Sequence, residues 1–186
     1  MQREYDIEIE WVHFPLHPET PQEGVTLEAL FAGRDYDIAA AQQRMQGLMQ
    51  QEGLPYSARN MTYNSRLAQE LGKWADSIGR GEALHDALFR AFFVDLVNLA
   101  EPDNLLRIAA SVGLPVDQAR EVLEQRTFKE QVNRDWALSM QLGITGVPTF
   151  VAGGYKVVGA QPYEVLQQLM QAAEARRRDA PAGDGE

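Results

Sequence analysis

The residues whose types could bind a metal ion lie near the N-terminus: His13, His17 and Glu19. Imidazole nitrogens and carboxylate oxygens are ligands that Zn²⁺ accepts. Their spacing does not bring the three side chains together, because it falls on a strand end and a proline loop and not on one helix face. We therefore expect scattered polar residues at a strand exit, and no metal site. His85, alone on an expected helix, is interpreted as a surface or half-buried histidine.

No catalytic nucleophile follows from the spacing of the remaining residues. Cysteine is absent from the 186 residues, which removes thiolates, disulfides and cysteine–zinc sites. The glycine pair 153–154 reads as a turn and not as a phosphate loop, since no Gly-Lys-Ser or Gly-Lys-Thr follows it. The serines form no Gly-x-Ser-x-Gly turn and no serine–histidine–acid set: Ser57, Ser65, Ser77, Ser111 and Ser139. The sequence thus indicates no catalytic residue and no cofactor.

Charge and hydrophobicity exclude some classes of partner. The chain has 17 basic and 27 acidic residues, a formal charge of −10, which disfavours nucleic acids and anionic membranes. No apolar run has the length of a membrane span. With 45% hydrophobic residues, the chain can bury a full core. We expect a water-soluble protein of one ordinary domain.

The most informative stretch is the run 142–159. It follows a helical pattern with apolar residues every four positions, and Gly143 occupies the place of a left-handed helix cap. Pro148 precedes a β-rich run, which suits the first residue of a strand. The glycine pair 153–154 then separates two β-rich runs, 149–152 and 155–158, and predicts a hairpin.

This order of parts resembles the C-terminal half of the thioredoxin fold. The run Gly-Val-Pro-Thr-Phe-Val at 146–151 and Val-Gly-Ala-Gln-Pro at 158–162 resemble the DsbA family, and most closely its FrnE-like branch. The resemblance implies a thioredoxin-like α/β fold with an all-helical insertion and a cis Val147–Pro148 bond. It also implies substrate binding by three residues. Val147 would offer its backbone N–H and C=O to an extended substrate, Pro148 would hold the geometry, and Thr149 would begin the strand.

The resemblance further implies thiol–disulfide exchange on protein or small-molecule thiols. That chemistry uses a Cys-x-x-Cys pair at a helix N-terminus. Without cysteine, the chain is expected to be inactive in exchange. One alternative is an enzyme like the kappa-type glutathione transferases and 2-hydroxychromene-2-carboxylate isomerases, which activate glutathione with a serine in the corresponding helix. Another is a non-catalytic peptide-binding module that uses the edge at Val147. A homodimer and a cytoplasmic location are also expected.

Residues 6–14 alternate at their start, with Ile7, Ile9 and Trp11 on one face, and predict a strand. By resemblance it is the second strand of the thioredoxin core. The family's first strand and catalytic helix would then be missing, and a fragment or a misassigned start is favoured over a naturally shortened homologue. Because the missing strand would lie between them, residues 6–14 should not pair with 149–152. Either an open slot or a strand from another chain is expected there.

The remaining boundaries follow from helix signals. Residues 1–25 would hold the second strand and its exit loop, 26–126 the helical insertion, 127–177 the C-terminal half of the fold, and 178–186 a disordered tail. Thr26 and Asp37 are expected N-caps, and Pro102 suits a first helical turn. The three tryptophans are expected in the core: Trp11, Trp74 and Trp136.

Overall fold

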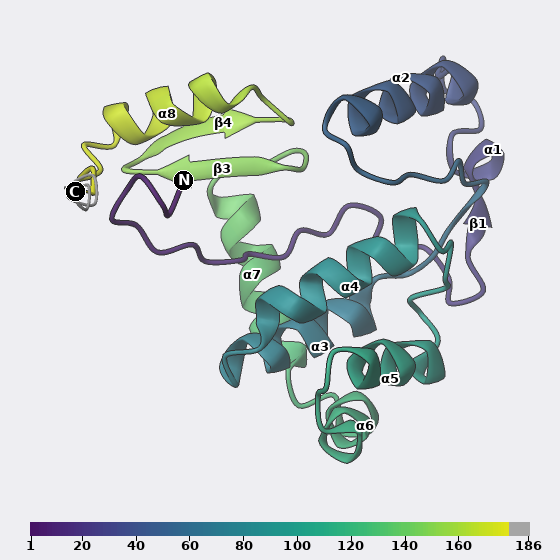
Figure 1. Ribbon diagram of the computed structural model, residues 1–186. Helices are drawn as coiled ribbons and strands as arrows, with labels where there is room; N and C mark the ends of the chain where they lie inside the picture. Colours follow the sequence, from purple (N-terminus) through teal and green to yellow (C-terminus); the bar gives the residue numbers. More distant parts are fainter. Residues whose placement is uncertain (179–186) are drawn as a thin grey trace, which may run out of the picture. The chain divides into compact units, whose positions relative to one another are not determined.

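The computed structural model describes residues 1–178 and is drawn in Figure 1. The chain divides into two compact units, which are described separately. The helical unit comprises residues 17–134, and the hairpin unit comprises residues 1–16 together with the described residues from Asp135 onward. Across residues 1–178, no helix has the length and apolar character that crossing a membrane requires.

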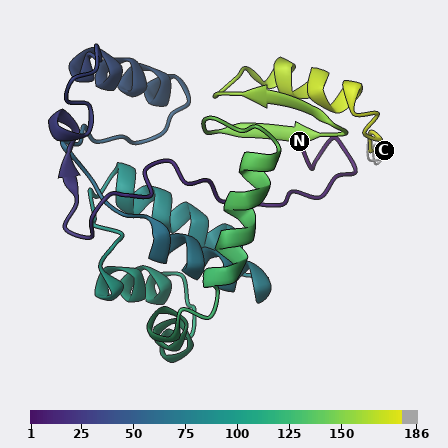
Figure 2. The ribbon, with the colours of Figure 1, turned by 180° about the vertical axis from the view of Figure 1, so that it is seen from behind.

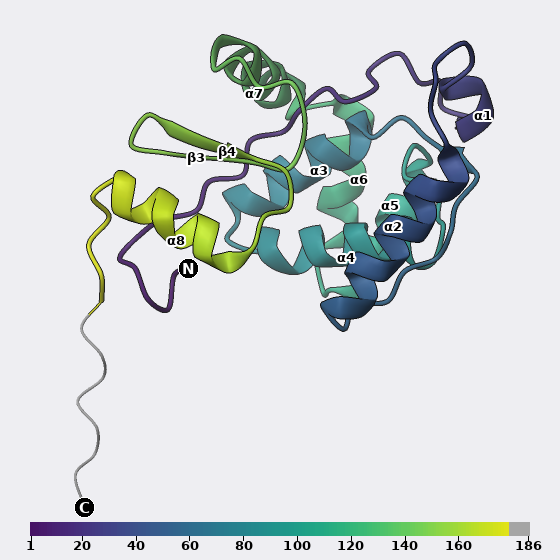
Figure 3. The same cartoon turned by 90° about the horizontal axis from the view of Figure 1, so that it is seen from above.

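The helical unit has one apolar core, formed where its central helices pack on one another (Figure 3). A short antiparallel ladder of β1 (Val25–Thr26) with β2 (Met61–Thr62) lies outside this core. Fully buried residues of the apolar core include Leu71, Leu84, Leu105 and Ala109. The helices of the unit are α1 (Leu27–Leu30), α2 (Ile38–Gln51), α3 (Arg66–Ser77), α4 (Gly81–Phe93), α5 (Pro102–Ser111) and α6 (Val116–Gln125).

Three helix starts lie where local chemistry predicts them. The Thr26 side chain accepts a hydrogen bond from the backbone N of Ala29 at 3.1 Å, and Asp37 accepts one from Ala40 N at 2.9 Å. Pro102 occupies the first turn of α5, where its missing N–H costs no helical hydrogen bond. These predictions are confirmed.

The apolar face of α2 is not part of the core. None of its residues is buried, and Met45 and Leu48 are 43% and 47% exposed. The helix is held at its polar side instead, where Gln42 Nε2 donates to the carbonyl of Arg59 at 2.7 Å.

The hairpin unit is built on β3 (Thr149–Ala152) and β4 (Tyr155–Val158), which pair antiparallel with Phe150 opposite Val157. Helix α8 (Tyr163–Ala172) covers one face of this hairpin, as Figures 1 and 2 show from opposite sides. Tyr5, Leu169 and Met170 form the small buried cluster beneath it. The predicted hairpin is confirmed.

The turn of the hairpin requires glycine. Gly153 and Gly154 have φ values of 55° and 84°, which a two-residue turn matched to the strand twist demands at both positions. A Cβ at Gly153 would also lie 2.9 Å from the Cα of Ala173, at the end of α8. Glycine therefore lets the turn fit against the helix.

The strand expected over residues 6–14 is not formed. These residues adopt no strand or helix, and Trp11 is 49% exposed instead of buried in a core. An isolated extended segment has no ladder to satisfy its backbone groups, so alternation alone does not make a strand. The segment is held at its start by an antiparallel bridge of Tyr5 with Arg177. The prediction that it does not pair with the hairpin is confirmed.

The start of that segment is bound by backbone hydrogen bonds to residues 176–178 and by a side-chain bond from α8. Asp6 N donates to Arg176 O at 2.8 Å, and Arg178 N donates to Glu4 O at 2.8 Å. Tyr163 Oη donates to Glu4 Oε1 at 2.7 Å, and this bond lowers the pKa of Glu4. Apart from Arg178, the tail expected over 178–186 lies outside the described residues.

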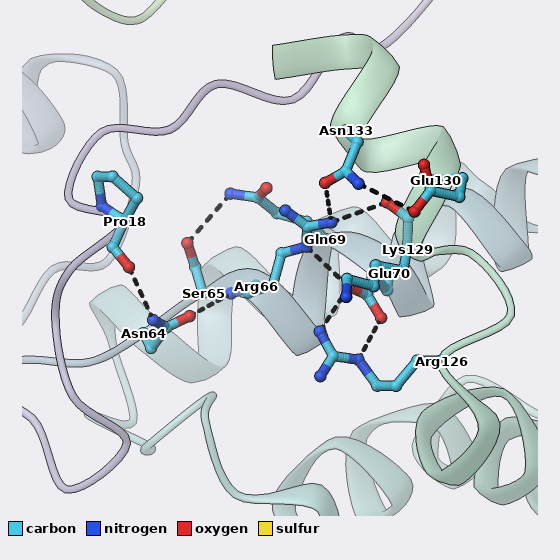
Figure 4. A network of polar contacts seen from close by, with 10 residues as sticks. All are labelled: Pro18, Asn64, Ser65, Arg66, Gln69, Glu70, Arg126, Lys129, Glu130 and Asn133. Atoms are coloured by element: carbon cyan, nitrogen blue, oxygen red, sulfur yellow. Dashed lines mark hydrogen bonds and ion pairs between the residues drawn. The ribbon is translucent and has the colours of Figure 1, made fainter. Parts of the chain in front are cut away.

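Helix α7 (Lys129–Gln141) carries the chain from the helical unit to the hairpin. Its first turn is fixed within the helical unit by Arg66, whose Nη2 donates to Lys129 O at 2.7 Å and to Asn133 Oδ1 at 2.6 Å. Arg66 Nε also donates to the fully buried carboxylate of Glu70 at 2.7 Å (Figure 4). The start of α7 is thus held by Arg66, which is itself bound to the buried carboxylate of Glu70.

Candidate functional site

The loop that follows α7 begins with a well-formed helix cap. Gly143 has a φ of 62°, and its N–H donates to Met140 O at 3.0 Å. Ile144 N donates to Ser139 O at 2.9 Å. This pair of bonds is the Schellman arrangement, which turns the chain sharply away from the helix axis.

Two further contacts shape the approach to β3. The Val147–Pro148 peptide bond is cis. The hydroxyl of Thr149 donates to Gly146 O at 2.7 Å, which closes the loop on itself. Gly159 N donates to Pro148 O at 2.7 Å, so the carbonyl of Pro148 faces the extension of β4.

The backbone of β3 therefore presents its groups alternately to two edges. Since the carbonyl of Pro148 points toward β4, the N–H and C=O groups of Thr149 and Val151 point to the opposite edge. Within residues 1–178, no strand pairs with that edge, because β3 and β4 form a two-stranded sheet. We call it the open edge of β3. Val147 lies at the loop end of β3 and is 50% exposed.

A lysine links the hairpin to the end of α7. Lys156 Nζ donates to the carbonyls of Leu142 and Gly143, each at 3.3 Å. A cation at a helix C-terminus is stabilised by the partial negative charge of the last carbonyls. Because Lys156 pairs with Val151 across the hairpin, the contact fixes the loop beside β3.

Apolar side chains are exposed around this loop. Met140 is 65% exposed and Val158 52% exposed. Val151 and Val158 extend from the hairpin face that carries Lys156, opposite the face covered by α8. The exposed apolar set, which we call the loop face, comprises Met140, Leu142, Val147, Val151 and Val158.

The structure brings the three expected binding residues, Val147, Pro148 and Thr149, together at the loop and the first position of β3. Sequence reasoning missed Val151 and Lys156. The two-residue period of strands could have assigned Val151 to the same edge as Thr149. The contact of Lys156 with a helix end had no signal in the sequence.

The histidines belong to different units of the chain. His13 belongs to the hairpin unit, where its backbone N donates to Asp135 Oδ2 at 3.0 Å, whereas His17 and Glu19 belong to the helical unit. His85 is buried in α4, not on the surface, and its Nε2 lies 3.1 Å from Asp76 Oδ1. The interpretation of His85 as surface or half-buried is therefore wrong. An acidic partner nine residues away, at the end of the preceding helix, explains how the core accommodates it.

Comparison with known proteins finds a family and solved structures of the same DsbA-like kind. The family described as the DSBA-like thioredoxin domain matches residues 1–171. The chain is 26% identical to the protein YwbO of Bacillus subtilis (strain 168), over 89% of this chain and 82% of that protein. A solved structure of a probable DsbA oxidoreductase from Streptomyces coelicolor is 30% identical, with a TM-score of 0.82, over 96% of this chain and 81% of that one.

A second solved structure, a candidate protein disulfide isomerase from Nitrosomonas europaea, shares the fold. Its TM-score is 0.62 at 18% identity, over 80% of this chain and 75% of that one. The mixed α/β architecture, with a helical insertion ahead of a hairpin and a closing helix, agrees with a DsbA-like thioredoxin fold. The chain belongs to the DSBA-like thioredoxin domain family.

Proposed function

We propose that the chain binds an extended segment of a thiol- or disulfide-containing partner at Val147, Pro148 and Thr149, as a member of the FrnE-like branch. The observation that carries this proposal is the open edge of β3, which presents the backbone groups of Thr149 and Val151 to no paired strand of the described chain. An extended peptide adds to such an edge as a further strand, and its main-chain hydrogen bonds supply affinity.

The surroundings of the edge favour a particular kind of segment. The loop face offers exposed apolar side chains beside the edge, so alternate apolar residues of a peptide would be buried on binding. The formal charge of −10 disfavours acidic segments. We therefore propose a neutral or basic segment with apolar residues at alternate positions.

Binding, and not exchange, is the activity assigned to these 186 residues. Thiol–disulfide exchange proceeds by attack of a thiolate on a disulfide sulfur. The sequence has no cysteine, and none of its hydroxyl or amine side chains replaces a thiolate in that step. Family membership supports thiols or disulfides as the partner's chemistry.

The test uses a seven-residue peptide of alternating valine and lysine, titrated into the 186-residue chain by calorimetry. N-methylation of alternate residues removes the N–H groups along one edge of an extended peptide. Two methylated peptides are compared, one with methyl groups at the odd-numbered positions and one with methyl groups at the even-numbered positions. We expect one of them to bind about tenfold or more weakly than the unmethylated peptide, and the other to bind within about twofold of it. Equal affinities in both registers would show that no strand pairing occurs.

A matched pair of variants places the peptide on the protein. Val147→Lys should weaken binding about tenfold, because it adds a charge like that of the peptide's lysines and removes an apolar contact at the loop. Tyr155→Lys introduces the same charge at a similarly exposed position at the other end of the hairpin. It should change affinity less than about threefold. Equal losses of peptide affinity in the two variants would show that the peptide binds elsewhere on the protein.

We place a homodimer contact at the same edge, since two copies of β3 can pair antiparallel and satisfy the same groups. Light scattering at increasing concentration measures this association, and the unmethylated peptide should reverse it. We also propose a cytoplasmic location, which cell fractionation would test.

A further inference from the structure

The hairpin unit contains a second stretch of backbone with which no strand of the described chain pairs, residues 7–12. Its sequence alternates apolar and acidic residues as a half-buried strand does. Residues 6–15 nevertheless contain no strand, helix, turn or bend, and Figure 1 draws them as a plain trace. Among the described residues, the backbone N–H and C=O groups make no hydrogen bond at five positions: Ile7, Glu8, Ile9, Glu10 and Val12.

Both ends of this stretch are fixed within the hairpin unit. At its start, Asp6 N donates to Arg176 O at 2.8 Å, and Tyr5 is buried in the small cluster beneath α8. At its end, His13 N donates to Asp135 Oδ2 at 3.0 Å. A backbone that is held at both ends loses little conformational freedom when a partner strand pairs with it, and this favours binding.

The side chains between these fixed ends are of two kinds. Ile7 packs against the small buried cluster, whereas Ile9 is 50% exposed. Glu8 and Glu10 are both exposed, and in an extended chain they point to the face opposite Ile9. Within residues 1–178 neither of the two forms an ion pair, whereas Asp6 is paired with two arginines. The stretch thus offers two carboxylates without a counter-charge beside an exposed apolar side chain.

We propose that residues 7–12, which we call the docking segment, bind an extended basic segment of a partner protein as an added β-strand. The main-chain hydrogen bonds of such a strand satisfy the backbone groups that have no partner within the described chain. Lysine or arginine residues at every second position of the partner lie opposite Glu8 and Glu10, and cross-strand pairs of opposite charge stabilise a ladder. Apolar residues at the positions between them cover Ile9.

Charge argues against a second copy of this chain as the partner. Two docking segments that pair with each other bring acidic side chains beside acidic side chains, and like charges directly opposite destabilise a ladder. The formal charge of −10 adds a general repulsion between copies. The docking segment is also independent of the binding proposed at the open edge of β3, because other residues carry it and other amide groups report on it.

The test measures amide hydrogen exchange of the full chain by NMR, with and without a saturating concentration of the seven-residue peptide of alternating valine and lysine. An added strand takes up the N–H groups that point to one edge, and these belong to every second residue. We expect exchange to slow at least about tenfold at alternate residues of the docking segment. Slowing confined to residues 149–151 would overturn the docking segment and leave the binding at β3. Unchanged exchange in both places would overturn both proposals.

Two double variants test the role of charge in this recognition. Glu8→Gln with Glu10→Gln removes both exposed carboxylates, so the peptide concentration that protects half of the docking segment should rise about fivefold. Glu121→Gln with Glu124→Gln removes the same charge from exposed positions of α6, and should change that concentration less than about twofold. Equal shifts in the two double variants would reduce the effect to net charge and overturn the proposal.

Discussion

Arg126 and Glu70, 56 residues apart, are joined by two parallel hydrogen bonds, from Nε to Oε2 at 2.6 Å and from Nη2 to Oε1 at 2.7 Å. The carboxylate is fully buried, and Arg66 donates to it as well. Arg126 ends α6 with a φ of 55°, in the left-handed region that non-glycine residues seldom adopt. The pair therefore links α3 to the end of α6, immediately before α7 begins.

Replacing this carboxylate should weaken the helical unit strongly. Glu70→Gln removes the negative charge of a buried carboxylate and leaves Arg66 and the partly exposed Arg126 without a counter-charge, which should lower the unfolding free energy by about 2 kcal/mol. Urea denaturation followed by circular dichroism measures it. The control is Glu121→Gln, an exposed residue of α6 that accepts from Gln125, with an expected change within about 0.5 kcal/mol. Similar losses in both variants would contradict a special role of Glu70.

The same carboxylate predicts how stability depends on pH. Burial acts to raise the pKa of Glu70, but hydrogen bonds from Arg126 and Arg66 outweigh it, and the pKa is lowered overall. Because the pKa of Glu70 is lower in the folded than in the unfolded state, its stabilisation is complete above the unfolded-state pKa of about 4.3. The stabilisation is lost as pH falls through the folded-state pKa. The stability gap between wild type and Glu70→Gln should thus be constant from pH 7 to about pH 5 and close at lower pH. A difference in stability between the two proteins that increases toward acidic pH would contradict this prediction.

Two glycine substitutions should act in opposite directions. Gly153→Ala places a Cβ against Ala173 at a φ of 55°, and should destabilise the hairpin unit by about 2 kcal/mol. Gly47→Ala, inside α2 with nothing within 4 Å of the added Cβ, should stabilise its helix by up to about 1 kcal/mol. Thermal melting of the two variants measures both. Changes of the same sign would show that local conformation does not govern these positions.

The chain should neither oxidise nor reduce dithiols. The thiolate that attacks a disulfide sulfur is absent from the sequence, so insulin reduction and dithiol-peptide oxidation should stay at the uncatalysed rate. A thioredoxin at the same concentration provides the positive control. Turnover by the 186-residue chain above the uncatalysed rate would require a nucleophile other than sulfur and would contradict this prediction.

Local rules predicted the parts of the fold that depend on neighbours in sequence. Thr26, Asp37 and Pro102 mark helix starts because their side chains act within three residues. Gly143 and the pair Gly153–Gly154 mark a cap and a turn, since few other residues adopt positive φ.

Contacts across long stretches of chain escaped prediction. No local signal pairs Glu70 with Arg126, 56 residues away, and the interpretation of His85 as surface or half-buried does not foresee Asp76 beside it. The strand expected over 6–14 failed for a related reason, because a strand exists only with a partner. At the candidate site, the three residues at 147–149 followed from the family resemblance, whereas the contact of Lys156 with the end of α7 did not.

The open edge of β3 also has a consequence for handling the protein in solution. An unpaired strand beside exposed valines is a template for stacking one molecule on the next. At neutral pH, a formal charge of −10 keeps molecules apart. As acid titrates the carboxylates this repulsion fades while the edge persists, so precipitation should set in on mild acidification, well before the helices unfold. Turbidity at fixed concentration would therefore rise at a higher pH than the loss of helical signal.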